Sequence, residues 1–161
     1  MIDTRGKSVV LIGLMGAGKT SVGRKLAEKL DMAFVDADEE IVKAAACSID
    51  NIFELYGEKA FRDVEEKVIS RLLEEGPQVM ATGGGAFMNP KTRALIAAAS
   101  VSVWLRAELD VLVRRTRRRG GRPLLKNKDP RAALKKLIDE RYPVYAKADI
   151  IVDSKDDGAD V

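Results

Sequence analysis

The chain contains no histidine, a single cysteine and few aromatic residues, and each of these scarcities excludes some chemistry. Without histidine, any proton transfer must use a carboxylate, a lysine, a tyrosine or water. With Cys47 alone, neither an intrachain disulfide nor a cysteine-based zinc site can form, which is typical of a protein from a reducing compartment. The chemistry of any active site therefore falls mainly to carboxylates and cations.

Long apolar runs are also missing. The stretch Val9–Ala17 is short, is interrupted by Gly13 and Gly16, and leads into Lys19 without a cleavage pattern. No segment is long enough to cross a membrane, so we expect a cytoplasmic protein without a membrane partner. The formal net charge of +3 suits a phosphorylated or carboxylated ligand but is too small to indicate nucleic acid. The 161 residues correspond to one domain, which can bury its own core as a monomer.

Short apolar runs alternate with longer segments of helical period. We expect strands at residues 8–14, 33–38, 78–82, 101–105 and 149–152, and helices at 19–30, 39–46, 58–75, 91–99, 108–118 and 130–141. This alternation predicts an α/β fold, with a parallel sheet covered by helices on both faces. Residues 119–128 are expected to form a loop. Such a sheet usually ends with one more helix, and we expect that helix to be absent after residue 153.

The segment "GLMGAGKT", Gly13 to Thr20, lies between an expected strand and an expected helix and matches the pattern G-x-x-x-x-G-K-[ST]. Its glycines let the backbone point N–H groups at phosphate oxygens, and the helix N-terminus adds a favourable dipole. Lys19 would neutralise the β- and γ-phosphates, and Thr20 would supply a hydroxyl to Mg²⁺. The alternative is a glycine turn with an accidental Lys-Thr pair. The pattern indicates a nucleoside triphosphate but does not name the phosphoryl acceptor.

Two acids, Asp36 and Asp38 in "VDAD", follow the second expected strand. On a strand their spacing would put both side chains on one face, at the edge where open α/β sheets bind ligands. One carboxylate could hold Mg²⁺ through water, and the other could orient or deprotonate an attacking hydroxyl. Alternatively, Asp38 caps the next helix, with Glu39 and Glu40 in its first turn. The two interpretations can coexist.

Two arginines occupy contrasting positions. Arg141 continues the apolar stripe of its helix, where a carboxylate-binding pocket would satisfy the guanidinium. Arg62 lies off the apolar stripe of its helix, close enough in sequence to pair with Glu65 or Glu66. Taken alone, Arg62 is typical of a solvated helix arginine.

Two glycine-rich segments complete the pattern. Gly83–Gly85 follow a strand, and three consecutive glycines favour a backbone brought against a ligand over an ordinary turn. In "RRRGGRPLL", Gly120 and Gly121 can act as hinges, while Pro123 favours an extended backbone at Arg122. This suits a lid that brings Arg122 onto a transferring phosphoryl group, although such arginine runs are usually solvated or bind nucleic acid.

Six motifs occur in one order: GLMGAGKT, VDAD, GEKAFRDVE, TGGGA, RPLL and ERYPVY. From residue 9 to 152 the chain resembles the shikimate kinases. The resemblance implies a P-loop NTPase fold of the nucleoside-monophosphate-kinase-like type, with a five-stranded parallel sheet in the order 2-3-1-4-5. It implies ATP-dependent phosphorylation of the 3-hydroxyl of shikimate, in the route to chorismate and the aromatic amino acids. The alternatives are another small-molecule kinase of this fold, such as a gluconate kinase, or a nucleotide-dependent RNA-binding protein.

The resemblance also implies roles for individual residues within a single kinase domain spanning residues 1–161. A substrate-binding helical region would cover residues 36–62, and a lid would cover residues 115–128. Catalysis would depend on Lys19, Asp38 and Arg122. ATP would be bound by Gly13, Gly16, Ala17, Gly18, Lys19, Thr20 and Ser21, with Arg115 stacking on adenine and Arg122 closing from the lid. Mg²⁺ would be held by Thr20 and, through water, by Asp36. Shikimate would contact Asp38, Phe53, Phe61, Arg62, Gly83, Gly84, Gly85 and Arg141.

Overall fold

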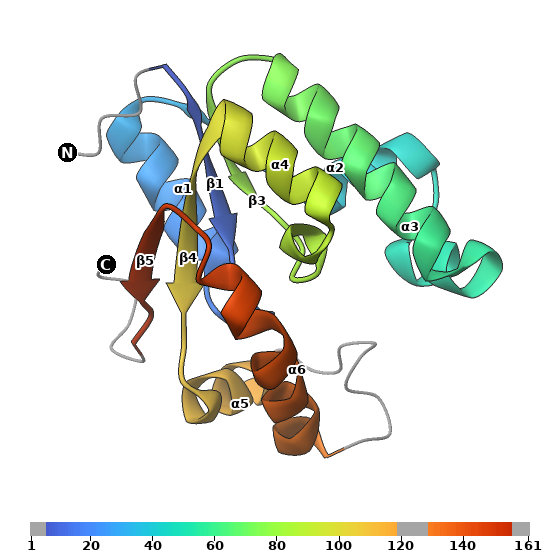
Figure 1. Ribbon diagram of the computed structural model, residues 1–161, viewed down its shortest axis with the longest axis vertical. Coiled ribbons are helices and arrows are strands. Elements are labelled where there is room, and N and C mark those ends of the chain that lie inside the picture. Colours follow the sequence, from blue (N-terminus) through green and yellow to red (C-terminus); the bar gives the residue numbers. More distant parts are fainter. Residues whose placement is uncertain (1–5, 119–128, 156–161) are drawn as a thin grey trace.

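The computed structural model describes residues 6–118 and 129–155, and its centre is a sheet of five parallel strands in the order β2-β3-β1-β4-β5 (Figure 1). The strands are β1 (Ser8–Ile12), β2 (Ala33–Asp36), β3 (Gln78–Ala81), β4 (Ser100–Arg106) and β5 (Ile150–Asp153). The predicted fold class, strand order and strand number are therefore confirmed.

The central strand β1 is apolar from Val9 to Ile12 because both of its faces are covered. All five of its residues are buried, and Val9 pairs in register with Val79 of β3 and Val101 of β4. A parallel sheet needs crossover connections, and here helices supply them. The fold thus brings the ends of all five strands to one edge, where the connecting segments meet.

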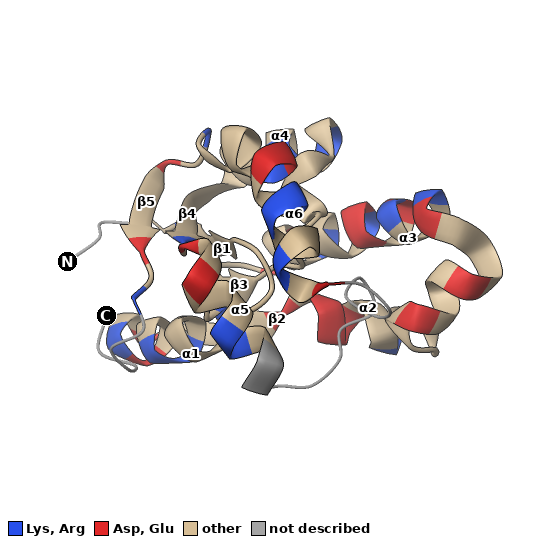
Figure 2. Cartoon of the chain, turned by 90° about the horizontal axis from the view of Figure 1, so that it is seen from below, with Lys and Arg blue, Asp and Glu red and all other residues tan. Residues whose placement is uncertain are grey.

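The helices lie on both faces of the sheet. They are α1 (Lys19–Leu30), α2 (Ala37–Ala45), α3 (Ile49–Glu74), α4 (Pro90–Ala99), α5 (Leu109–Arg118) and α6 (Pro130–Tyr145), with a short 3₁₀ helix η1 (Ala86–Met88) after β3. In Figure 2, α1 lies on one side of the row of strands, and α4 and α6 lie on the other. None of the helices in the described ranges combines the length and hydropathy that a membrane-spanning segment needs.

Two helix boundaries differ from the prediction. Helix α3 begins at Ile49, where Ser48 caps it, and not at residue 58. The backbone of Gly57 (φ 88°) is not helical, so it divides α3 into two helical pieces, and the prediction covered only the second. Helix α6 continues beyond Arg141 to Tyr145 although Pro143 lies within it. Proline removes only its own N–H, and the bond from Ala146 N–H to the Tyr142 carbonyl, at 3.0 Å, still closes the last turn.

The predicted functional segments all follow the carboxyl ends of strands. The phosphate-loop sequence follows β1, the acidic pair lies at the end of β2, and the glycine triplet follows β3. Figure 2, which looks onto these ends, shows the acidic start of α2 and basic stretches on α5 and α6 around them. The predicted loop at residues 119–128 lies outside the described residues, as does the end of the chain after residue 155.

Candidate active site

The phosphate-loop sequence forms a tight turn between β1 and α1. Gly16 (φ 85°) and Gly18 (φ 98°) have left-handed backbone conformations that other residues rarely adopt. A Cβ atom on Gly13 would lie 2.9 Å from the Leu105 carbonyl oxygen, so only glycine lets the loop pack this closely on β4. Gly18 is also the N-cap of α1, which places the first N–H groups of that helix at the loop.

Two cations hold this loop by its carbonyl groups. Lys19 Nζ donates to the carbonyls of Gly13 at 2.6 Å and Leu14 at 3.2 Å. The Arg115 guanidinium donates to the carbonyls of Gly16 and Ala17, both at 3.1 Å. Because the N–H of a trans peptide points opposite to its C=O, the amide of residue 18 faces away from Arg115.

Arg115 also joins the loop to the segment after β5. It donates to Ser154 Oγ at 2.9 Å and to the Lys155 carbonyl at 2.6 Å. The Ser154 hydroxyl in turn donates to the Ala17 carbonyl at 2.9 Å. The arginine assigned to adenine by resemblance therefore lies between the phosphate loop and the end of β5.

The acidic pair is arranged differently from the prediction. Strand β2 ends at Asp36 and α2 begins at Ala37, so Asp38 is helical and the alternation of a strand does not apply to it. The capping residue is Asp36, whose Oδ1 accepts from the Asp38 N–H at 2.9 Å. The prediction that Asp38 caps the helix is therefore wrong. The cap leaves the Asp38 side chain to extend from the first turn of α2 toward Gly83.

The glycine triplet provides the space into which three charged side chains extend. A Cβ atom on Gly83 would lie 2.9 Å from Asp38 Oδ1. On Gly84 it would lie 2.8 Å from Arg141 Nη1, and on Gly85 only 2.2 Å from Arg62 Nη2. Helices α2, α3 and α6 thus bring one carboxylate and two guanidinium groups to a backbone without side chains.

This cluster also lies against the phosphate loop. The Cβ position of Gly84 is 3.5 Å from the Gly13 carbonyl oxygen, which itself accepts from Lys19. The acidic and basic residues predicted for the acceptor therefore converge next to the residues predicted for the nucleotide. Such a pair of adjacent sites can hold a phosphoryl donor and an anionic acceptor together.

Arg62 is held by a buried carboxylate that the sequence analysis named only as a possible partner. Its Nη1 donates to Glu65 Oε1 at 2.9 Å, and its Nη2 lies 3.7 Å from Glu58 Oε1. Glu65 is 1% exposed, and burial raises the pKa of its carboxyl to about 7, although Arg62 acts to lower it. Within the described residues, Glu65 Oε2 makes no hydrogen bond.

The two predicted aromatic residues lie together on α3. The ring centroids of Phe53 and Phe61 are 4.7 Å apart, and the Arg62 guanidinium lies 5.0 Å from the Phe61 centroid. Phe61 is buried, whereas Phe53 is 37% exposed. Phe61 therefore supports Arg62 directly, and Phe53 forms an apolar surface beside it.

The predicted magnesium ligands suit an ion that retains water. Mg²⁺ is usually held by one or two carboxylates and the substrate phosphates, with several waters retained. Thr20 lies in the first turn of α1, and Asp36 lies at the end of β2. Among the described residues, no three carboxylate or thiol groups form a cluster that could hold a metal by themselves. This sparse set fits a magnesium–nucleotide complex.

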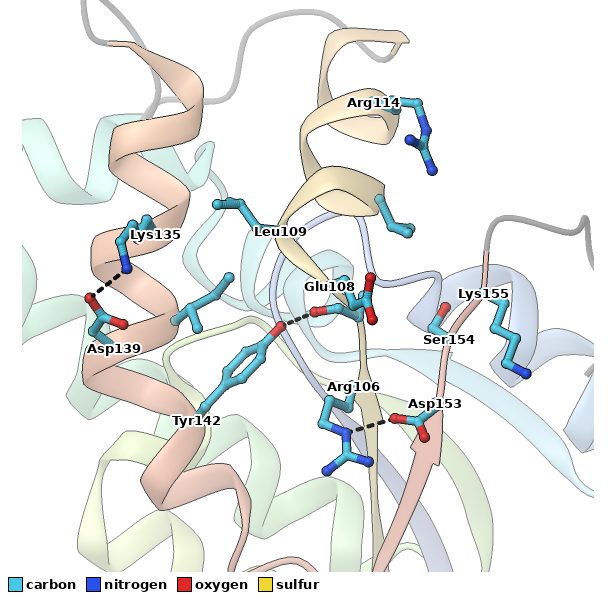
Figure 3. Close-up of a pocket in the computed structure, with 13 residues that line it drawn as sticks. Arg106, Glu108, Leu109, Arg114, Lys135, Asp139, Tyr142, Asp153, Ser154 and Lys155 are labelled. Carbon is cyan, nitrogen blue, oxygen red and sulfur yellow. Dashed lines mark hydrogen bonds and ion pairs between the residues drawn. The ribbon is translucent and has the colours of Figure 1, made fainter.

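A separate pocket of about 820 Å³ lies between α5, α6 and the ends of β4 and β5 (Figure 3). Its walls include Tyr142 and the ion pair of Arg106 with Asp153, whose Nε and Oδ1 atoms are 2.6 Å apart. None of the predicted acceptor residues lines it. It borders the nucleotide region at Ser154.

The structure brings Asp38, Arg62 and Arg141 together at Gly83–Gly85 beside the phosphate loop, whereas Arg122 lies outside the described residues. Two further residues belong to the cluster but were not predicted as site residues. Glu65 was named only as one of two possible partners of Arg62, and Tyr145 could have been found from its position four residues after Arg141. The exposed Ser21 follows Thr20 in the first turn of α1.

The phosphate loop, parallel sheet and adjacent acceptor cluster define a P-loop phosphotransferase. A sequence model of the shikimate kinase family matches residues 15–160. A shikimate kinase of Mesorhizobium japonicum is 54% identical over 96% of this chain and 76% of its own length. One from Paramagnetospirillum magneticum is 55% identical over 94% of this chain and 78% of its own length. The chain belongs to the shikimate kinase family.

Solved structures agree with this assignment. The shikimate kinase of Acinetobacter baumannii, solved in complex with shikimate, matches with a TM-score of 0.90 and 36% identity, over 95% of this chain and 86% of that one. A gluconokinase of Sinorhizobium meliloti matches with a TM-score of 0.58 and 21% identity, over 92% of this chain and 83% of that one. The second likeness shows the shared fold alone.

Proposed function

We propose that this chain transfers the γ-phosphoryl group of ATP to the 3-hydroxyl of shikimate, the activity expected of its family. The observation that carries the proposal is the convergence of Asp38, Arg62 and Arg141 on the glycine triplet beside the phosphate loop. Shikimate carries one carboxylate and several hydroxyls, and this cluster offers cations for the former and a carboxylate for the latter.

On the nucleotide side, Lys19 and the N–H groups of the phosphate loop would neutralise the phosphate oxygens. Hydrogen bonds from Lys19 and Arg115 to the loop carbonyls restrain the conformation of the loop and so the direction of its N–H groups. Preorganised donors of this kind stabilise charge that develops in the transition state without further rearrangement. Thr20 and Asp36 would hold Mg²⁺, which supplies additional positive charge to the phosphates.

On the acceptor side, Arg62 and Arg141 would bind the carboxylate of shikimate by charge-assisted hydrogen bonds. Asp38 would accept a hydrogen bond from the 3-hydroxyl, orient it for in-line attack and receive its proton. Glu65 Oε2, buried and without a donor among the described residues, would accept from a shikimate hydroxyl or a bound water. Arg122, by resemblance, would close over the transferring group.

The test is ADP release with Mg²⁺ and ATP, measured with shikimate, D-gluconate, AMP or no acceptor. Turnover with shikimate alone is the expected result. Turnover with gluconate instead would support the proposed role of the phosphate loop in binding ATP but would contradict shikimate as the acceptor. Equal ADP release without any acceptor would contradict the kinase assignment altogether.

We further propose that the protein works as a cytoplasmic monomer that does not bind nucleic acid. The small net charge and the half-buried position of the only cysteine support this proposal. Sedimentation at micromolar concentration and a titration with RNA at two salt concentrations test the oligomeric state and nucleic-acid binding. A dimer would contradict the proposed monomer, and salt-dependent RNA binding at physiological ionic strength would contradict the proposal that the protein does not bind nucleic acid.

A further inference from the structure

Tyr145 reaches the acceptor cluster from the last turn of α6. It lies four residues after Arg141, so both side chains extend from the same face of the helix. Tyr145 is completely buried, and its hydroxyl donates to the Gly84 carbonyl. Burial raises the pKa of this phenol to about 12, with the positive charge of Arg141 acting in the opposite direction, so the hydroxyl keeps its proton at neutral pH.

The peptide held by Tyr145 lies at the centre of the site. A Cβ atom on Gly84 would lie 2.8 Å from Arg141 Nη1, 3.5 Å from the Gly13 carbonyl oxygen and 3.7 Å from the Tyr145 hydroxyl. Gly84 thus lies between the phosphate loop and one of the two acceptor arginines. A glycine backbone has more conformational freedom than any other, so this position needs an external restraint.

Holding the carbonyl of residue 84 also orients the next amide. The carbonyl of Gly84 and the N–H of Gly85 belong to the same trans peptide and point in opposite directions. When the carbonyl is turned toward Tyr145, the Gly85 N–H is turned away from α6. The Arg141 guanidinium lies beside the same hydroxyl, because the Cβ position of Gly84 is 2.8 Å from Arg141 Nη1 and 3.7 Å from the Tyr145 hydroxyl, and the two groups interact electrostatically.

We propose that Tyr145 is a positioning residue for the acceptor: its hydroxyl holds the Gly84 carbonyl and Arg141, and so directs the Gly85 N–H and the Arg141 guanidinium at the bound carboxylate-bearing substrate. The proposal rests on the proposed function, because it assumes an acceptor at this cluster. It concerns the hydroxyl and not the ring, which packs against Trp104 with ring centroids 5.8 Å apart.

The chain offers a matched control for the loss of a tyrosine hydroxyl. Tyr142 contacts the same Trp104 ring, with centroids 4.8 Å apart, and lies on the same helix. Its hydroxyl donates to the Ala107 carbonyl at 2.5 Å, on the wall of the separate pocket (Figure 3). Tyr142→Phe therefore removes a partly buried tyrosine–carbonyl hydrogen bond from the same aromatic cluster without touching the glycine triplet.

The experiment compares the wild type, Tyr145→Phe and Tyr142→Phe by steady-state kinetics with Mg²⁺ and ATP, and by calorimetric titration with shikimate alone. For Tyr145→Phe we expect the KM and Kd for shikimate to rise about tenfold, as the loss of one hydrogen bond to a positioned group permits. The KM for ATP should stay within about twofold of the wild type, because the phosphate loop keeps its own cations. Tyr142→Phe should leave both constants unchanged.

Thermal unfolding of the three proteins separates positioning from stability. If Tyr145→Phe and Tyr142→Phe lower the Tm equally but only the former weakens shikimate binding, the positioning role holds. Unchanged shikimate binding in Tyr145→Phe overturns the inference, as does a parallel rise of both KM values. If Tyr145→Phe does not fold while Tyr142→Phe does, the Tyr145 hydroxyl is needed for folding, and the inference is also overturned.

The wild type distinguishes failure of this inference from failure of the proposed function. If the wild type binds and phosphorylates shikimate and Tyr145→Phe does so equally well, only the role of Tyr145 is refuted. If the wild type neither binds nor phosphorylates shikimate, the proposed function fails and the inference fails with it.

Discussion

The nucleotide side and the acceptor side of the site are built in different ways. The phosphate loop is one contiguous segment, and Lys19 within it donates to the loop's own carbonyls at Gly13 and Leu14. The acceptor cluster is assembled from α2, α3, α6 and the segment after β3, and its charged groups meet only because the sheet places these elements at one edge. The loop itself is local in sequence, with distant support from Arg115 and Ser154, whereas the acceptor cluster is a product of the whole fold.

This difference determines how each side tolerates change. The loop is specified mainly by its backbone conformation, so its function depends on a few glycines and on the two cations, Lys19 and Arg115, that hold its carbonyls. In the acceptor cluster, the positions of Arg62 and Arg141 depend on Glu65, on the glycine triplet and on Tyr145. We therefore expect substitutions on the nucleotide side to lower kcat, and substitutions on the acceptor side to weaken the binding of shikimate.

The largest expected effect is that of Lys19→Ala. Removing the cation should lower kcat by roughly a thousandfold, as expected for loss of a group that stabilises transition-state charge. Shikimate affinity, measured by titration without nucleotide, should remain within about twofold, because Lys19 belongs to the other side. Lys29→Ala, an exposed lysine at the end of the same helix, serves as control. A parallel loss of shikimate affinity would show that the two sides are not separable.

Glu65→Gln should change how stability depends on pH. The folded-state pKa of about 7 lies above the ordinary value of 4.5, so the folded protein holds this proton more tightly than the unfolded chain does. The resulting stabilisation, about 3 kcal/mol, is fully present below pH 4.5 and is lost as the pH rises through 7.

Urea unfolding between pH 4.5 and pH 8 measures this contribution. Glutamine cannot ionise, so the variant should lack the part of the pH dependence that belongs to Glu65. Glu28→Gln, an exposed glutamate near the end of α1 that lies away from the phosphate loop, should retain the wild-type profile. Identical pH profiles for Glu65→Gln and the wild type would contradict the raised pKa.

The contrast between the two sides also explains what could be predicted from the sequence. The phosphate loop was predicted at each residue because its pattern is contiguous and its geometry follows from glycine and helix-terminus physics. The parallel sheet and the edge location of the site followed from the alternation of strands and helices, whereas the strand order followed from the resemblance to the shikimate kinases. What failed was local: a strand end displaced by two residues changed the capping residue from Asp38 to Asp36.

The unpredicted parts depend on contacts between distant segments. Neither the burial of Glu65 nor the bond from Tyr145 to Gly84, 61 residues away, leaves a mark in local sequence. Arg115 was assigned to adenine, but its bonds to the phosphate loop span 98 and 99 residues. The helix predicted to end at Arg141 continues through Pro143 to Tyr145, because its last turn keeps its hydrogen bond.

Arg141→Ala should affect the acceptor side alone. Loss of a charge-assisted hydrogen bond costs about 1.5–3 kcal/mol, so the KM for shikimate should rise roughly 10- to 100-fold while the KM for ATP stays nearly constant. The control is Arg131→Ala on the same helix, which removes an exposed ion pair with Asp110 and should change neither constant. An unchanged KM for shikimate in Arg141→Ala would remove this arginine from the proposed site.

The smallest and most specific effect is expected from Gly85→Ala. Gly85 has an ordinary right-handed conformation (φ −93°, ψ −6°), so alanine is compatible with the backbone. The added Cβ would lie 2.2 Å from Arg62 Nη2, so the guanidinium must move. We expect the KM for shikimate to rise about tenfold through the displaced arginine, with kcat less affected.

A double-mutant cycle with Arg62→Ala tests whether the methyl group acts through that arginine. If it does, Gly85→Ala should cost little in the Arg62→Ala background, because the group it displaces is already gone. Additive effects would instead mean that the methyl group blocks the acceptor directly. Non-additive effects would show a second difference between the two sides. On the nucleotide side, Gly16 and Gly18 are needed because their backbone is left-handed. At Gly85, glycine is needed because a side chain there would displace Arg62, which extends from another helix.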